Sequence, residues 1–255
     1  MKNIIKKCKV YSDLALIYDF VMRHVNYREW AEYIKTLINV SGMEVKTILD
    51  ISCGTSSLGL QLLELGYEVY GFDYSYDMVF QGIKKIREKN KELLLWCGDM
   101  SRFYYKREFD AIICVYDSIN YLMKEDQWLK VFNCVYDTLK PGGLFIFDIS
   151  TEANSLRYFK DSKEKVRGAG FRYTRICKYN QKDRIQINEF HIHWKHKPSY
   201  VSIEKHEQIV IPFKRVIKLI PASKFILLGK YHDFMTIEAN EISNRIHFLL
   251  KKYIQ

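Results

Sequence analysis

Residues 47–56 read Thr-Ile-Leu-Asp-Ile-Ser-Cys-Gly-Thr-Ser, a short apolar run that breaks into a turn of small residues. Residues 57–65 then have the apolar spacing of a helix, so this stretch predicts a strand, a tight turn and a helix in succession. In an open parallel sheet, ligands bind at the carboxyl ends of the strands, where small residues let backbone N–H groups approach them. The pattern Gly-x-Gly-x-x-Gly does not occur here, so the stretch lacks the nicotinamide-cofactor fingerprint.

Acidic residues lie at the ends of three successive predicted strands. Asp50 ends the first, Asp73 ends the segment Val-Tyr-Gly-Phe-Asp at 69–73, and Asp99 follows the third in Cys-Gly-Asp-Met at 97–100. A carboxylate after the second strand can accept hydrogen bonds from both ribose hydroxyls of an adenosine, and it disfavours a phosphate there. Asp99 can receive an amino group such as that of adenine. The three acids therefore favour an adenosine-bearing ligand over NADP.

The first 150 residues alternate short apolar runs with amphipathic segments, which is typical of βαβ units and a parallel sheet. One or two helices are expected over residues 12–39, and Lys-Pro-Gly-Gly at 140–143 should end the last helix and turn the chain into a strand. The predicted strands are 47–51, 68–72, 93–97, 111–116 and 144–149, and the predicted helices are 57–65, 77–88 and 126–139.

After residue 149 the apolar pattern changes to period 2. Three stretches, 170–179, 184–194 and 200–210, predict an antiparallel meander that caps the sheet. A short helix from residue 213 and strands at 225–231 and 245–250 are expected to follow.

Composition bounds the class of protein. The 255 residues are 48% hydrophobic and 15% aromatic, enough for one α/β domain with an insertion. The chain begins MKNIIKKCKV, without the apolar core of a signal peptide, and has no apolar stretch long enough to span a membrane, so we expect a soluble, cytoplasmic protein. Its six cysteines are widely spaced, which argues against a disulfide framework or a zinc ribbon.

Charge is unevenly distributed along the chain. Residues 1–150 carry 19 Lys and Arg against 20 Asp and Glu, whereas residues 151–255 carry 21 against 10. A basic second half suggests an anionic substrate, such as a phosphate-bearing metabolite or a nucleic acid. A solvated lysine-rich surface is an equally good interpretation.

The motifs LDISCGTS, VYGFD, CGDM, FDAIICVYDSINYL and LKPGGLFIFDI, in this order and spacing, resemble those of class I S-adenosylmethionine-dependent methyltransferases. The resemblance covers nearly the whole chain and is greatest to small-molecule enzymes that act on nucleotide-linked amino sugars. Those enzymes share a Tyr-x-x-x-Ala-x-x-Tyr-Asp segment, here 11–19, and a closing strand, here 244–248.

The resemblance implies a doubly wound α/β fold: a mostly parallel seven-stranded sheet with a reversed C-terminal hairpin and an antiparallel insertion. We therefore expect a cofactor-binding core with a helical lid at 1–150, a cap at 151–212, and a helix with two strands completing the sheet at 213–255.

The resemblance also assigns cofactor contacts. Methionine-side contacts fall on the turn after the first strand, ribose and adenine contacts on the next two strand ends, and sulfonium-side contacts on the fourth, while three tyrosines close the site. These residues are Asp50, Ser52, Cys53, Gly54, Asp73, Tyr74, Met78, Gly98, Asp99, Met100, Tyr116, Ser118, Tyr11, Tyr18 and Tyr27. Where the family usually has glycine, Ser56 adds a side chain at a close helix–turn contact, and Ser52 is a milder departure.

Methyl transfer from a sulfonium is an in-line displacement, so the enzyme chiefly positions the reactants and removes a proton only where the nucleophile carries one. Candidates for orientation or proton removal are Tyr18, Asp117, Tyr121 and His191. The related sugar enzymes have a histidine near the position of Tyr121, which leaves the proton acceptor open. No acidic or thiol ligand completes a set with the histidines of the meander, so no metal site is predicted.

The favoured hypothesis is an S-adenosylmethionine-dependent methyltransferase (EC 2.1.1.-) that methylates nitrogen or oxygen of a small anionic metabolite. A nucleic-acid methyltransferase is the second hypothesis, although an Asn/Asp-Pro-Pro-aromatic motif is missing after the fourth strand. A relative that has lost catalysis and serves as a binding module is the third, because of Ser52 and Ser56. The expected partner is a small-molecule methyl acceptor. No association with a membrane is expected, and a homodimer is compatible with the sequence.

Overall fold

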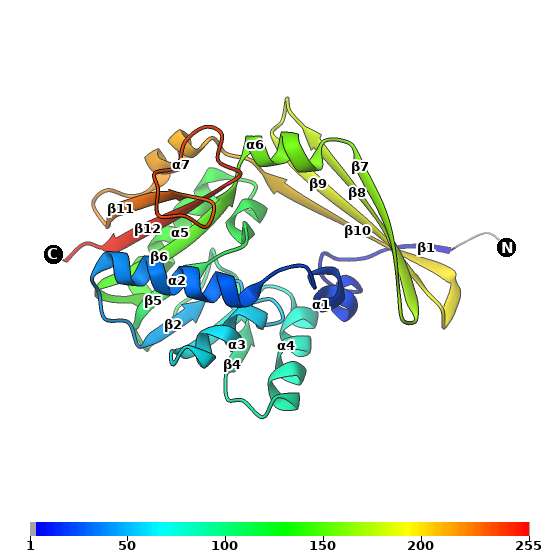
Figure 1. Ribbon diagram of the computed structural model, residues 1–255, viewed down its shortest axis with the longest axis horizontal. Coiled ribbons are helices and arrows are strands. Elements are labelled where there is room, and N and C mark those ends of the chain that lie inside the picture. Colours follow the sequence, from blue (N-terminus) through cyan, green and yellow to red (C-terminus); the bar gives the residue numbers. More distant parts are fainter. Residues whose placement is uncertain (1–3, 255) are drawn as a thin grey trace.

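The computed structural model describes residues 4–254; residues 1–3 and 255, which belong to the first and last expected segments, lie outside the described part. Two sheets organise the chain (Figure 1). None of the helices within residues 4–254 is long and apolar enough to cross a membrane.

The larger sheet has seven strands in the order β11-β12-β6-β5-β2-β3-β4. Neighbours from β6 to β4 run parallel, whereas β12 is antiparallel to β6 and β11 is antiparallel to β12. This is the predicted doubly wound sheet with its reversed hairpin. Its strands are β2 (Thr47–Asp50), β3 (Glu68–Asp73), β4 (Leu94–Cys97), β5 (Phe109–Cys114), β6 (Leu139–Ser150), β11 (Phe225–His232) and β12 (Arg245–Lys252).

Apolar clusters pack helices against this sheet. Helices α2 (Tyr27–Ser41) and α3 (Ser57–Glu64) pack with alternate residues of β2, β5 and β6, and α5 (Glu125–Thr138) and α7 (Phe213–Leu219) pack with the intervening residues. Helix α4 (Tyr76–Glu88) packs against α3 and β4. Because successive strand side chains point to opposite faces, these two clusters cover both faces of the sheet.

The segment 140–143 behaves differently from the simple turn expected there. Helix α5 ends at Thr138 and β6 begins at once, with Leu139 paired to Phe109 and Leu144 paired to Ala111. The Pro and Gly residues between them therefore form a bulge in the strand, and Gly142 takes a φ of +73°.

The second sheet has five strands in the order β1-β10-β9-β8-β7, not the three expected. Its strands are β1 (Ile4–Lys7), β7 (Ser162–Gly168), β8 (Phe171–Asn180), β9 (Ile185–Trp194) and β10 (Lys197–Ile209). The central three match the predicted meander. The two edge strands were missed because both are largely solvent-exposed, so their sequences lack the alternation that burial of one face imposes.

The N-terminal chain joins the two sheets. After β1, which pairs in parallel with β10, it forms the 3-10 helix η1 (Leu14–Ile17) and helix α1 (Tyr18–Val21), and then enters α2. Figure 1 shows α1 between α4 and the antiparallel sheet. The expected helices over 12–39 are thus present, and the first of them is short.

Candidate active site

A cavity of about 370 Å³ lies where the carboxyl ends of β2 and β5 meet the N-terminal segment and the antiparallel sheet. Pockets of this size hold small molecules. Of the cofactor contacts predicted from sequence, those on the methionine and sulfonium side and on the N-terminal segment line it: Asp50, Ser52, Cys53, Gly54, Tyr116, Ser118, Tyr11, Tyr18 and Tyr27. The predicted ribose and adenine contacts lie outside its lining.

The turn after β2 is held by carboxylates. Ser52 N donates to Asp50 Oδ1 at 3.0 Å, and Gly54 N donates to Asp73 Oδ2 at 2.9 Å. Ser75 N donates to the other oxygen of Asp73, also at 2.9 Å. Gly54 has a φ of +54°, a left-handed conformation that favours glycine. The predicted small-residue turn is therefore tied directly to the acid at the end of β3.

The chemistry of this edge fits the expected cofactor. Asp50 is 3% exposed, and burial raises the pKa of its carboxyl to about 7 although Ser52 N lowers it. A cationic amino group in the cavity would stabilise the ionised form of this carboxylate. Burial likewise raises the pKa of Asp73. The methionine end of S-adenosylmethionine carries such an amino group, so the residues present suit it.

The residues predicted to contact adenine lie outside the cavity lining. Tyr74 is 80% exposed, Met78 is buried, and Asp99 Oδ1 accepts hydrogen bonds from the backbone and the hydroxyl of Ser101. A Cβ on Gly98 would lie 2.8 Å from the ring of Phe72, so this strand end requires glycine. Met100 packs against the core beside β5.

Ser56 occupies a position that strains the start of α3. Its φ is +56°, its side chain is 1% exposed, and its Oγ finds no hydrogen-bond partner among residues 4–254. Space for it comes from Gly59, where an added Cβ would lie 2.4 Å from Ser56 Oγ. The serine is thus accommodated by a glycine one helical turn later.

Replacing Ser56 with glycine should stabilise the protein by about 1–2 kcal/mol, because it removes a left-handed side chain and a buried, unpaired hydroxyl. Thermal or urea unfolding measures this. Gly59→Ala should cost less in the Ser56→Gly background than in the wild type, since the two side chains compete for one space. Strictly additive effects would contradict this account.

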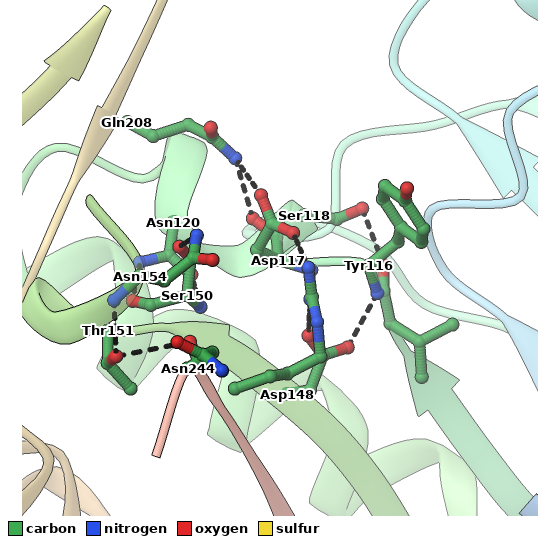
Figure 2. A network of polar contacts seen from close by, with 12 residues as sticks. Tyr116, Asp117, Ser118, Asn120, Asp148, Ser150, Thr151, Asn154, Gln208 and Asn244 are labelled. Atoms are coloured by element: carbon green, nitrogen blue, oxygen red, sulfur yellow. Dashed lines mark hydrogen bonds and ion pairs between the residues drawn. The ribbon is translucent and has the colours of Figure 1, made fainter. Parts of the chain in front are cut away.

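A buried ion network fixes the end of β5. Tyr116 and Asp117 have φ values of +63° and +51°, and their amides donate to the two oxygens of Asp148 at 2.5 and 2.9 Å. Arg245 bridges Asp148 and Asp117, with 2.6 Å between its Nη2 and Asp117 Oδ1. Gln208 Nε2 donates to Asp117 Oδ2 at 2.6 Å. Figure 2 shows Gln208 and Asp148 converging on Asp117 from opposite sides. Both oxygens of Asp117 are therefore engaged.

The N-terminal segment is held at two places. Glu204 of β10, which is fully buried, accepts hydrogen bonds from Tyr11 N and Leu14 N, both at 2.8 Å. Lys85 of α4 pairs with Asp19 of α1 at 2.6 Å and donates to the hydroxyl of Thr55 at 2.9 Å. These contacts place the tyrosines of the segment against the cavity.

The four candidates for orientation or proton removal fall in different places. Tyr18, Asp117 and Tyr121 line the cavity, and burial raises the pKa of Tyr18 and Tyr121. His191 does not line it: it pairs with Ile203 across the sheet, on the face opposite to Asn188 and Phe190, and lies 2.5 Å from Glu189. The side chain of His191 therefore lies on the face of the sheet that does not line the cavity.

Another histidine, one that the sequence did not single out for proton removal, reaches the cavity. Nδ1 of His206 lies 3.0 Å from the hydroxyl of Tyr121, and that hydroxyl lies 2.7 Å from the hydroxyl of Tyr11. Arg245, Asp148, Glu204, Gln208 and Arg175 were also missed. The available signal was polar residues at alternate positions of a predicted strand, as in Glu204, His206 and Gln208.

The cap contributes one further charge to the cavity. Arg175 of β8 donates from Nε and Nη2 to Asn188 Oδ1 at 2.9 and 2.7 Å. Its guanidinium carbon lies 5.4 Å from the ring centre of Phe159 and 5.7 Å from that of Phe190. Its Nη1 lies 3.9 Å from Glu164, a long ion pair that leaves the group free to bind an anion as well.

The chain is similar in sequence and in fold to known methyltransferases. Residues 48–143 match the family described as a methyltransferase domain. YqeM of Bacillus subtilis (strain 168), a provisionally named methyltransferase, is 26% identical over 245 residues, covering 95% of this chain and 97% of that protein. The crystal structure of an S-adenosylmethionine-dependent methyltransferase from Clostridium acetobutylicum ATCC 824 has a TM-score of 0.80 at 24% identity, covering 95% of this chain and 99% of that one.

A more distant relative is named for its substrate. The dTDP-3-amino-3,4,6-trideoxy-α-D-glucopyranose N,N-dimethyltransferase of Streptomyces venezuelae is 25% identical over 138 residues, which cover 53% of this chain and 56% of that protein.

Proposed function

We propose that the protein is a class I S-adenosylmethionine-dependent methyltransferase that methylates nitrogen or oxygen of a small, anionic metabolite; residues 48–143 match a methyltransferase domain, and the fold is similar to that of an S-adenosylmethionine-dependent methyltransferase. The observation that carries the proposal is one cavity lined both by the turn after β2 and by Arg175 of the cap. In this proposal residues 1–150 bind the cofactor, 151–212 bind the acceptor, and 213–255 complete the sheet.

The cofactor side follows from the carboxylates. When bound, S-adenosylmethionine would supply a methyl group whose carbon an acceptor nucleophile can attack in line, with the sulfur leaving as a neutral thioether. Asp50 would hold its amino group, and Asp73, oriented by the amide of Gly54, would hold its ribose. Tyr74, Met78 and Asp99 would surround the adenine. Tyr11, Tyr18 and Tyr27 would exclude water from the reacting centre.

Arg175 supports an anionic acceptor. A guanidinium presents a planar set of N–H donors that matches a phosphate or a carboxylate, and Asn188 already fixes two of those donors. The rings of Phe159 and Phe190 flank it and reduce its contact with water. A nucleotide-linked amino sugar would bring both a phosphate and an amine, and the named activity of the Streptomyces venezuelae relative is on such a compound.

The cysteines bear on location. All six are free thiols in the described structure, and five of them are buried or half-buried. Free thiols are typical of reducing compartments, which supports the proposed cytoplasmic location.

Thermal unfolding tests the proposal. S-adenosylhomocysteine at about 100 times its Kd should add about 2.7 kcal/mol of stability, a rise of roughly 5–10 °C for a protein of this size. A dTDP-linked 3-amino sugar added to that complex should raise Tm further. Arg175→Met should abolish the second rise and leave the first unchanged, because Arg175 lies on the acceptor side of the cavity.

Each alternative predicts a different result. A binding module that has lost the cofactor site would show no shift with S-adenosylhomocysteine. A nucleic-acid methyltransferase would show the first shift, would ignore the sugar nucleotide, and would bind RNA or DNA with an affinity that falls steeply with salt.

A further inference from the structure

Four titratable side chains lie in a row from the cavity into the cap, the first three joined by hydrogen bonds and the last facing His206 at ion-pair distance. The hydroxyls of Tyr11 and Tyr121 lie 2.7 Å apart, the Tyr121 hydroxyl lies 3.0 Å from His206 Nδ1, and His206 Nε2 lies 3.4 Å from Glu204 Oε2. Tyr11, Tyr121 and His206 line the cavity. His206 is 2% exposed and Glu204 is fully buried. Burying so many polar groups costs free energy of folding, so packing alone does not explain this arrangement.

The polarity of the chain follows from Glu204. Its Oε2 accepts from Tyr11 N at 2.8 Å, and its Oε1 accepts from Leu14 N at 2.8 Å and from Ser12 Oγ at 3.2 Å. Both oxygens therefore act as acceptors. Nε2 of His206 faces these oxygens at 3.4 Å and makes no hydrogen bond among residues 4–254. A ring proton on Nε2 is favoured over a lone pair there, because a lone pair would be repelled by the carboxylate, and this leaves Nδ1 as a lone-pair acceptor.

The lone pair on Nδ1 orients the two hydroxyls. Tyr121 donates to Nδ1, so its oxygen accepts from Tyr11. Burial raises the pKa of both phenols, so each keeps its own proton. The end of the chain that faces the cavity is consequently an oxygen lone pair, and a group in the cavity can donate a proton to it but cannot receive one.

The surroundings of His206 limit what else could set its protonation. Tyr11 from the N-terminal segment, Tyr121 from the 3-10 helix η2 (Ser118–Tyr121) and Glu204 of its own strand are the titratable groups in contact with the ring. Strand β9 contributes the uncharged ring of Phe190, 5.6 Å away between centres. Asp117 and Asp73 act on Tyr121 only through space.

We propose that His206 takes up the proton that the substrate loses during methyl transfer, and that this proton reaches His206 through the hydroxyls of Tyr11 and Tyr121. The proposal rests on the proposed function. It implies that the methylated group is a nucleophile that must lose a proton. An acceptor ammonium gives one proton to the Tyr11 oxygen, the phenolic proton of Tyr11 passes to the Tyr121 oxygen, and the phenolic proton of Tyr121 passes to Nδ1 of His206. The products are a neutral amine, two unchanged phenols and an imidazolium facing Glu204. The amine lone pair is then free to bond to the methyl carbon, and the electron pair of the breaking sulfur–methyl bond stays on sulfur.

Nitrogen-15 NMR of the full chain, labelled in histidine and saturated with S-adenosylhomocysteine, tests the polarity without any acceptor. The expected spectrum shows His206 with a protonated Nε2 and an unprotonated Nδ1 near neutral pH. His206→Asn assigns the signal by its loss, and His193→Asn, on the opposite face of the sheet, is the matched control. A proton on Nδ1 would overturn the proposal. Failure of the chain to bind S-adenosylhomocysteine would instead refute the cofactor premise.

Kinetics with a dTDP-linked 3-amino sugar test the transfer itself. His206→Asn keeps a hydrogen-bond acceptor near Nδ1 but cannot take a proton, so kcat at pH 7 should fall about 100-fold or more. The deficit should shrink as pH rises and the amine loses its proton in solution, and the thermal shift with S-adenosylhomocysteine should not change. An unchanged kcat, or a deficit independent of pH, would mean that His206 only packs the cap. If the wild type does not methylate this amine, the proposed class of methyl acceptor is wrong. The NMR result alone then decides which nitrogen of His206 carries the proton.

Discussion

Arg245→Met is expected to lower the free energy of unfolding by about 3–5 kcal/mol at pH 8. Arg245 is half-buried, with 18% of its side chain exposed, and is the cation paired with both Asp148 and Asp117, two carboxylates that are themselves nearly inaccessible to water. Methionine fills a similar volume but leaves two buried charges uncompensated. Urea unfolding of the variant and the wild type, with the slope checked for equality, measures the difference.

The same substitution should be less harmful in acid. Burial raises the folded-state pKa of Asp148 to about 6 even with Arg245 present, which is above its value in an unfolded chain. The stability that this group contributes is thus complete below about pH 4 and is lost as pH rises through about 6. Without the guanidinium the pKa should rise further, so the loss relative to the wild type should be smaller at pH 5 than at pH 8.

Arg215→Met is the matched control for this prediction. Arg215 pairs with Glu125 at 2.5 Å, but both side chains are largely exposed, so water and salt screen the interaction. Its removal should change stability little at either pH. If Arg245→Met costs no more than Arg215→Met, the network is not what fixes the end of β5.

The strand and helix pattern of the core could be predicted because buried elements have a characteristic spacing of apolar residues. Strands buried on both faces give continuous apolar runs, and amphipathic helices give a spacing of three to four residues. The edge strands β1 and β7 face water on most of their length, so nothing in their composition separates them from a loop. The same logic explains why β8, β9 and β10 were found and their two neighbours were not.

The predicted residues that line the cavity lie on three stretches with recognisable motifs: the turn after β2, the segment after β5 and the N-terminal tyrosines. The turn around Gly54 can be predicted from its run of small residues, and Asp73 can be predicted from its place at the end of a strand. The sequence does not show which face of β9 and β10 points to the cavity, because apolar residues occupy both faces of β9: Ile185 and Ile187 on one, Phe190 and Ile192 on the other. His191 was therefore preferred to His206, although only the face that carries His206 covers the cavity.

Asp73→Asn should weaken binding of S-adenosylhomocysteine by about 100-fold, because a charged acceptor is worth about 1.5–3 kcal/mol per hydrogen bond. Each carboxylate oxygen of Asp73 already accepts a backbone N–H, from Gly54 on one side and Ser75 on the other, both at 2.9 Å. An asparagine must point its NH₂ group at one of these donors. The variant thus loses either the turn or the start of α4, as well as an acceptor for ribose. Isothermal titration measures the Kd directly.

Asp77→Asn separates this local geometry from a general loss of negative charge. Asp77 is exposed in the first turn of α4, only four residues from Asp73, and it has no hydrogen bond to the turn after β2 within the described chain. Its neutralisation should leave the Kd within about two-fold, since an exposed helix-end charge is worth at most about 1 kcal/mol and acts on the helix, not on the cavity. Equal losses in the two variants would mean that Asp73 attracts the cofactor only through its charge. An unchanged Kd in Asp73→Asn would mean that the ribose is held elsewhere, and the edge formed by β3 and β4 would then have no part in binding.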